Sequence, residues 1–421
     1  MEIMALTGGV PGVDCGGFCE FCYFKSVDRN SSPVLGCKNC GPEKMGCSYC
    51  EGIVQLPKMK FKSLNDVIMG LRHEMLLMEL AGLMDNDVTV NIGSWADILF
   101  YPYLNHLISI LKNQDFKVHL GYTSGKGIKN IGEAQNLLNT GIDEVSFSVL
   151  STDPNMRNRW MNDKTPEASI SSLKLFCENI DVNASIVVIP GIITENELIK
   201  TCTDLEDWGV KSLVLSRFAN LPKQGLILNK KPIISGIEPD PFEKFCELVE
   251  TMNKEFNFTI YGSPAYHPDK SIPYVLSEPK NQKYLKTLNK VQTDATIVTS
   301  SLSAGYIEKI FNSIDDNNHV NVVSVDKEIA DLITMEDLES LDLNQMKDRV
   351  VLPGGTLVHD KQAQKCFQRD GKVRTVLRGP MLLFSPCPDW DMDEEKLIEF
   401  ECGSFNTLIN TINSQQFFKI D

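Results

Sequence analysis

The chain has 421 residues, of which 56 are acidic and 41 are lysine or arginine, so its formal net charge is −15. A hydrophobic fraction of 42% and a charged fraction of 23% are typical of globular domains and exclude a largely disordered chain. We expect no membrane span, because no long apolar run is free of charges, and no nucleic-acid surface, because such surfaces are basic. The length predicts two or three domains.

The N-terminus and the cysteines predict the compartment. The first residues lack the charged and apolar regions of a secretory signal, so we expect a cytoplasmic protein. Of 13 cysteines, seven fall between Cys15 and Cys50. Thiols stay reduced in the cytoplasm, so this clustering predicts metal sites rather than disulfides. The later cysteines are isolated, which is typical of core packing.

After the cysteine-rich segment 1–60, helical and strand patterns alternate. Residues 61–84 carry apolar side chains at helical spacing, and a β-branched run follows at 88–92. The unit then recurs, with helices expected at 103–111, 134–139, 167–176 and 195–208 and strands at 118–120, 145–150, 185–189 and 212–215. This alternation predicts an α/β fold in which 61–225 form a partial (β/α)6 barrel, with ligands at the carboxyl ends of its parallel strands.

Residues 226–288 are rich in proline and glycine and are expected to connect the barrel mouth to a second domain. In the domain expected at 289–421, the pattern predicts strands at 295–299, 320–325 and 350–352 and helices at 303–314 and 405–412. We therefore expect a smaller C-terminal α/β domain, although the pattern does not specify its topology.

The first three cysteines have the spacing C-x3-C-x2-C, at Cys15, Cys19 and Cys22. Three thiolates can hold three irons of a four-iron (4Fe-4S) cubane and leave the fourth iron open, whereas electron carriers normally use four cysteines. The alternative is a zinc loop or buried thiols. The spacing, with an aromatic residue before the last cysteine, is specific to radical S-adenosylmethionine (SAM) enzymes.

A second group has the pattern C-x2-C-x6-C-x2-C and comprises Cys37, Cys40, Cys47 and Cys50. Paired C-x2-C units give tetrahedral sulfur coordination for a single zinc or iron ion. Such a site has no open position, so we expect it to be structural. The sequence does not choose between iron and zinc, and a second cluster is the alternative.

Several segments together resemble one known family. They are VDCGGFCEFCYFK at the first cysteines, the cysteine loop after it, HLGYTSGKG around Tyr122, RFANLPKQGLILN from Arg217 and LPGGTLVHD around His359. In this combination the chain resembles, from end to end, the methanogenesis marker protein ten family. The resemblance implies a radical SAM, cobalamin-dependent methyltransferase that acts on an arginine side-chain carbon of the methyl-coenzyme M reductase α subunit. It does not identify the electron donor.

The resemblance also implies roles for the metal ligands. Cys15, Cys19 and Cys22 match the cluster ligands, and the second cysteine group matches a loop that binds one iron. Tyr122 matches a tyrosine that can ligate the fourth cluster iron, and it follows a short strand, at the edge where a ligand is expected. A core or surface tyrosine is the alternative.

The expected SAM contacts depart from the usual pattern. Radical SAM proteins often have a Gly-Gly-Glu segment after the second strand, whereas this chain has GSWADIL, with Gly93, Ser94 and Asp97. Asp97 is expected to accept from the SAM ammonium group. Gly191, after the fifth strand, resembles the turn near adenine. Ser148 and Arg217 end strands at the same mouth, and each of these residues could equally be an ordinary turn or rim residue.

The cobalamin and substrate contacts rest on the resemblance alone, because the D-x-H-x-x-G signature of base-off cobalamin proteins is absent. Leu332 matches an apolar residue below the corrin. The rival lower ligand is His359, whose alternative role is to bond its own backbone, and the turn Gly354-Gly355 could approach the corrin rim. Asp163 and Asp389 match or lie near acidic positions expected to bind the target guanidinium, with solvated surface acids as the alternative. The rival functions are a SAM-only peptide maturase and an iron-sulfur scaffold.

Overall fold

The structure is a computed structural model, and it describes residues 2–25, 60–80, 88–224, 231–264, 266–267, 274–356, 358–380 and 393–414. These residues form two compact units. The first ends at Gly262, and the second begins at Ser263 and also contains residues 221–224 and 231. Within the described residues, no helix combines the length and apolar character needed to cross a membrane.

The first unit is built on a seven-stranded sheet whose spatial order, β1 to β7, follows the chain. The strands are β1 Glu2–Leu6, β2 Thr89–Gly93, β3 Lys117–Thr123, β4 Glu144–Ser148, β5 Asp181–Val188, β6 Ser212–Arg217 and β7 Thr259–Ser263. Neighbours from β1 to β6 pair in parallel. Right-handed crossovers that always step to the next position curl such a sheet into a partial barrel.

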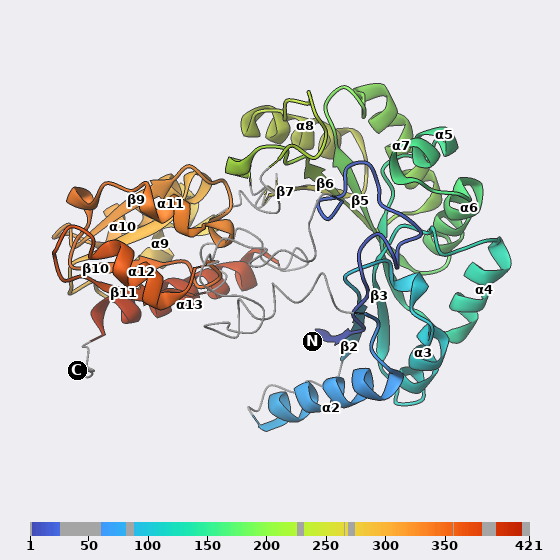
Figure 1. Cartoon of the computed structure of the whole chain (residues 1–421), viewed down its shortest axis with the longest axis horizontal. Coiled ribbons are helices and arrows are strands. Elements are labelled where there is room, and N and C mark those ends of the chain that lie inside the picture. Colours follow the sequence, from blue (N-terminus) through green and yellow to red (C-terminus); the bar gives the residue numbers. More distant parts are fainter. Residues whose placement is uncertain are drawn as a thin grey trace. The chain divides into compact units, whose positions relative to one another are not determined.

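The crossover helices lie along one side of this sheet in Figure 1. They are α2 Leu64–Leu80, α3 Leu104–Lys112, α4 Ile131–Thr140, α6 Pro166–Cys177, α7 Glu195–Trp208 and α8 Phe242–Glu255. Their ends follow local chemistry. The Thr194 hydroxyl accepts from the Glu197 amide at the start of α7, and Gly209 ends that helix at a φ of 85°, a conformation that favours glycine.

Alternation along the strands gives the sheet one apolar and one polar face. Val90, Ile92 and Val145 are fully buried, as period-two patterning against covering helices requires. On the other face, His119 contacts Glu2 through Nδ1 at 2.9 Å and Ser146 through Nε2 at 2.8 Å. The polar face is therefore held by hydrogen bonds between strands.

The first unit differs from the expectation in its number of strands. β1 and β7 flank the five strands whose positions were predicted from the sequence. The sheet therefore has seven strands, whereas a partial (β/α)6 barrel was expected. β1 is a five-residue strand without β-branched residues except Ile3, and β7 lies in the proline- and glycine-rich stretch expected only to connect domains. That stretch instead supplies α8 and β7 to the first unit.

The second unit contains a four-stranded parallel sheet in the order β11-β10-β8-β9. Its strands are β8 Ala295–Ser300, β9 Val320–Val325, β10 Arg349–Leu352 and β11 Thr375–Arg378. Because the chain moves to β9 on one side of β8 and then to β10 on the other, the crevice between the carboxyl ends of β8 and β10 is a topological switch point, where open α/β sheets bind ligands.

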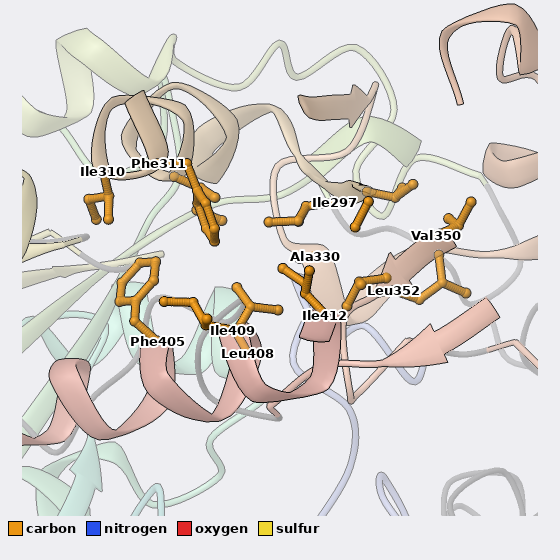
Figure 2. Packing of buried hydrophobic residues seen from close by; sticks show 14 of the residues in the cluster. Ile297, Ile310, Phe311, Ala330, Val350, Leu352, Phe405, Leu408, Ile409 and Ile412 are labelled. Atoms are coloured by element: carbon orange, nitrogen blue, oxygen red, sulfur yellow. The ribbon is translucent and has the colours of Figure 1, made fainter. Parts of the chain in front are cut away.

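Two helices cover the core of this unit (Figure 2). Helix α10, Ser301–Ile314, contributes Phe311, and helix α13, Glu394–Asn413, contributes Phe405, and the two ring centroids are 6.3 Å apart. Figure 2 shows Ile412 of α13 close to Leu352 of β10, so the long C-terminal helix closes the sheet. Helices near 303–314 and 405–412 were predicted, although α13 begins earlier.

The buried Glu401 of α13 predicts a pH-dependent stability. Its carboxylate accepts from the amides of Val275 and Leu276, each at 3.0 Å, and burial raises the pKa of Glu401 from 4.5 to about 7. The folded state therefore binds more protons between these values, and stability is lost as the pH rises through this window. At 1.36 kcal/mol per pH unit, the expected loss is about 3 kcal/mol.

Urea unfolding of the wild type and of Glu401→Gln at pH 5 and pH 8 measures this loss. The glutamine variant should lack this part of the pH dependence, whereas Glu399→Gln, an exposed change on the same helix, should retain it. Identical pH profiles for the wild type and Glu401→Gln would contradict the assignment.

Candidate active site

A cavity of about 380 Å³ opens at the carboxyl edge of the first sheet. Its walls come from the cysteine segment, the turn after β2 and the ends of β3 to β6, and include Cys15, Cys19, Cys22, Ser94, Trp95, Asp97, Tyr122, Ser124, Lys126, Ser148, Ser185 and Ser216. The cysteine motif thus lies at the strand ends, where parallel sheets place their ligands.

The three thiols face this cavity from a tight loop. The Gly12 amide lies 3.4 Å from the Cys15 sulfur, and the Cys19 thiol lies 3.5 Å from the Met161 carbonyl. Gly17 has a φ of 107°, and a Cβ there would approach the Asn162 side chain to 2.3 Å, so this turn requires glycine. The loop is therefore shaped by close contact with the segment after β4.

Burial raises the pKa of all three thiols, and that of Cys22 to about 11. The thiols therefore stay protonated until a metal displaces the proton. In the described part of the chain, no group of three or more His, Cys, Asp or Glu side chains is placed to hold one metal ion. The three thiols line one cavity, which suits a cubane, because each thiolate of a cubane binds a different iron.

Tyr122, near the end of β3, lines the same cavity. Its hydroxyl bonds with Ser148 of β4, so these two predicted residues meet. Although 45% of the Tyr122 surface is exposed, desolvation at the hydroxyl end and the nearby Cys19 raise its pKa well above the ordinary value. The phenol is thus placed beside the thiols as a neutral group until a metal binds.

Asp97 has a different role from the one expected. It is fully buried, and its Oδ1 accepts from Leu99 N at 3.1 Å and Thr123 Oγ1 at 2.7 Å. Its Oδ2 accepts from Ser124 N at 2.8 Å and Ser124 Oγ at 2.6 Å. A carboxylate has about four acceptor positions, and all are used here. Asp97 therefore fixes the turn after β3 and has no position left for the SAM ammonium group.

Asp163 also needs correction. It is fully buried, and its Oδ2 accepts from Arg157 Nε at 3.0 Å and Nη2 at 2.9 Å. Arg157, likewise fully buried, also donates to the carbonyls of Val149, at 2.6 Å, and Ser124. The carboxylate already binds the chain's own guanidinium, so it is not available to a substrate arginine. Arg157 instead ties together the segments after β3 and β4.

The other predicted SAM contacts lie around the rim or in the wall. Ser94 lines the cavity, but its hydroxyl donates to Gly8 O at 2.7 Å. The Gly93 carbonyl accepts from Thr7, so it supports the turn. Gly191 follows β5 at a φ of 73° and Arg217 ends β6, where its Nε donates to Asp240 O at 2.7 Å. Neither Gly191 nor Arg217 lines the cavity.

The residues expected to meet cobalamin lie in the second unit. A Cβ on Gly355 would come within 2.5 Å of the Asp331 carboxylate, so this glycine makes room for the chain's own side chain rather than for a corrin. Leu332, which is half-buried, follows Asp331 in the chain, and Gly354 precedes Gly355, so the approach of Asp331 to Gly355 brings these two residues into the same region of the second unit. The His359 Nδ1 accepts from the Lys361 amide at 3.1 Å and caps helix α12, Asp360–Phe367. A bond to the backbone was the alternative to metal ligation that was predicted from the sequence for this histidine.

Five predicted residues lie outside the described residues, namely Cys37, Cys40, Cys47, Cys50 and Asp389. The cavity residues that were not predicted include three polar ones, Lys126, Ser185 and Ser216. Ser185 and Ser216 follow the two-residue period of their strands, so the sequence indicates on which face of the sheet they lie. It does not indicate a function for them. Lys126 had a stronger signal, because glycines bracket it in the segment TSGKG.

Comparison with known proteins adds to this geometry. Residues 110–213 match the family described as the radical SAM-like domain. This part of the chain is a radical SAM-like domain. The family accounts for a 4Fe-4S cluster and SAM as cofactors. The chain thus combines a radical SAM-like parallel-sheet core with a second, smaller parallel-sheet domain.

Solved structures are similar to parts of this chain at low identity. SuiB from Streptococcus suis covers 63% of this chain and 49% of its own, with 12% identity and a TM-score of 0.40. A radical SAM methyltransferase from Sphaerobacter thermophilus covers 54% and 63%, with 12% identity and a TM-score of 0.37. The chain spans about half the length of SuiB. No curated protein sequence matches the chain.

Proposed function

We propose that this enzyme is a cobalamin-dependent methyltransferase that adds a methyl group to an sp3 side-chain carbon of an arginine in the methyl-coenzyme M reductase α subunit. The observation that carries the proposal is the cavity in which the thiols of the C-x3-C-x2-C loop lie beside Tyr122. When bound, a four-iron cluster with an open iron and SAM supply radical chemistry. An arginine methylene needs such chemistry, because it has no acidic proton for a general base.

The chain's own residues would hold these groups. Cys15, Cys19 and Cys22 would ligate three irons, and Tyr122 would reach the fourth. Ser148 and Ser185 are register partners on β4 and β5 and both line the cavity, so their hydroxyls can hydrogen-bond the ribose and base of SAM. The cysteine loop at 37–50 would hold a single iron or zinc ion.

The second unit supports cobalamin as the methyl carrier. The switch point between β8 and β10 is the expected ligand edge. At the end of β8, Thr299 is fully buried, and its hydroxyl has no hydrogen-bond partner among the described residues, which is unusual for a buried polar group without a ligand. By resemblance, Leu332 would lie below the corrin, and His359 is not proposed as the lower ligand, because its Nδ1 accepts from the Lys361 amide.

The proposed substrate is a basic protein segment. The net charge of −15 suits a basic target. Among the described cavity residues the single carboxylate is Asp97, whose acceptor positions are used. The proposed partner of the target guanidinium is Asp389, which lies near an acidic position of the family that the chain resembles and outside the described residues. We further propose that the enzyme acts in the cytoplasm, where its thiols stay reduced.

Anaerobic assay of the reconstituted enzyme tests the proposal. With SAM, reductant, cobalamin and a peptide that spans the target arginine, mass spectrometry should find one added methyl group on an arginine carbon. Methylation that persists without cobalamin would favour a maturase that uses only SAM. Absence of SAM cleavage would favour an iron-sulfur scaffold and overturn the proposal.

Tyr122→Phe should separate two uses of SAM. Without the phenolate, the fourth iron stays open to SAM, so reductive SAM cleavage should continue at the wild-type rate. Methyl transfer from SAM to cobalamin should fall by about tenfold or more, which corresponds to 1.4 kcal/mol in the barrier. Tyr103→Phe, at an exposed tyrosine, is the control. Equal losses in both reactions would contradict a role as a switch.

A further inference from the structure

Lys126 brings a positive charge against a cluster ligand. Its Nζ lies 3.7 Å from the Cys19 sulfur and donates to the carbonyls of Gly17 at 2.8 Å and Met161 at 3.0 Å. Both carbonyls are neutral, and none of the ion pairs found among the described residues includes Lys126. The ammonium charge is therefore balanced locally by no carboxylate and faces the site of the cluster.

The turn that carries Lys126 has little conformational freedom. Gly125 has a φ of 80°, and a Cβ there would approach Phe147 to 2.6 Å, while a Cβ on Gly127 would approach Leu99 to 2.6 Å. The preceding residue, Ser124, is held by both Asp97 and Arg157. These constraints preorganise the lysine, although a lysine in a solvated loop would need none of them.

The other buried charges around the thiols do not duplicate this role. Arg157 is neutralised by Asp163 at 2.9 Å. Asp97 is negative and raises the pKa of Cys15, whereas the Lys126 charge lowers the pKa of Cys15, Cys19 and Cys22. Reduction adds a negative charge to a cluster, so a nearby cation and a hydrogen bond to a ligand sulfur stabilise the reduced form. Lys126 is thus the charge that favours reduction.

We propose that Lys126 is a positioning residue that raises the reduction potential of the cluster by placing its ammonium group against the Cys19 thiolate. The inference rests on the proposed radical SAM function and deepens it, because it names the residue that makes the cluster reducible by a physiological donor. The effect is exerted on the cluster and not on the substrate, so it should appear in the absence of any target protein.

An EPR-monitored redox titration of the full-length, reconstituted enzyme without SAM tests this. In Lys126→Met, the ratio of reduced to oxidised cluster at a fixed potential should fall by about tenfold or more, which is a shift of about 59 mV for one electron towards negative values. Lys126→Arg should shift by less than a third of that. Lys129→Met, which removes an exposed lysine from the same segment, should titrate as the wild type does.

Each outcome decides between the possibilities. A Lys126→Met enzyme that titrates like the wild type overturns the inference, and if it also binds SAM more weakly, Lys126 holds the SAM carboxylate instead. If Lys126→Met does not retain its cluster, Lys126→Gln, which keeps a donor but loses the charge, takes its place under the same criterion. Failure of the wild type to assemble a four-iron cluster, measured by iron and sulfide content, would overturn the proposed function instead.

Discussion

Cys19→Ser should reduce SAM cleavage to background, a loss of about a thousandfold or more, because the enzymatic acceleration depends on a cluster that the variant cannot hold in an active form. The Cys19 thiol meets the Met161 carbonyl at 3.5 Å and the Lys126 ammonium at 3.7 Å. A serine hydroxyl is a poor iron ligand, because soft thiolates are what iron-sulfur clusters select. The measurement is 5'-deoxyadenosine release under anaerobic, reducing conditions.

The matched control is Cys246→Ser. Cys246 is a half-buried thiol on α8 in the same unit, and it does not line the cavity. Its replacement should leave both the iron content and SAM cleavage unchanged. Retention of full iron content and cleavage by Cys19→Ser would contradict the assignment of the C-x3-C-x2-C motif.

Arg157→Met should lower the free energy of unfolding by about 3–5 kcal/mol, the usual cost of removing one partner of a buried ion pair. Both Arg157 and Asp163 are fully buried, so the variant leaves a carboxylate without its cation in a dry site. The variant also loses the bonds to Val149 O and Ser124 O that join two strand ends. Equilibrium urea unfolding of the cluster-free protein, followed by circular dichroism, measures the effect.

Two further variants separate charge from packing. Arg159→Met removes an exposed guanidinium that stacks on Trp160 at 5.3 Å, and it should cost no more than about 1 kcal/mol. The double variant Arg157→Met, Asp163→Leu should lose less than the sum of the single changes, because no uncompensated charge remains. A loss below about 1 kcal/mol for Arg157→Met would show that the pair is not structural.

The sequence predicted the sheet because its signals are local. The helix at 195–208 and the strands near 118–120 and 145–150 follow from apolar periodicity, and they agree with α7, β3 and β4. β1 and β7 were missed because each lies beside a segment with another strong signal, the cysteine motif after β1 and the prolines and glycines around β7. Position at the carboxyl edge followed from the parallel topology, so the cysteine motif could be placed without coordinates.

The roles of acidic residues could not be predicted in the same way. Asp97 and Asp163 both follow strands near the mouth, as substrate-binding carboxylates do. Their actual partners are donors brought by other segments, such as Ser124 and Arg157, and only tertiary packing pairs them. Periodicity therefore placed these side chains at the right edge but could not show that their hydrogen-bonding capacity was already used.

The central claim is that three thiols hold a four-iron cluster with one iron not bound by cysteine. Mössbauer spectroscopy of the enzyme reconstituted anaerobically with ⁵⁷Fe tests it most directly. We predict one iron whose environment differs from that of the three thiolate-bound irons, because only three cysteines of this loop reach the cavity. Four equivalent sulfur-bound irons, or zinc alone at these thiols, would contradict the account.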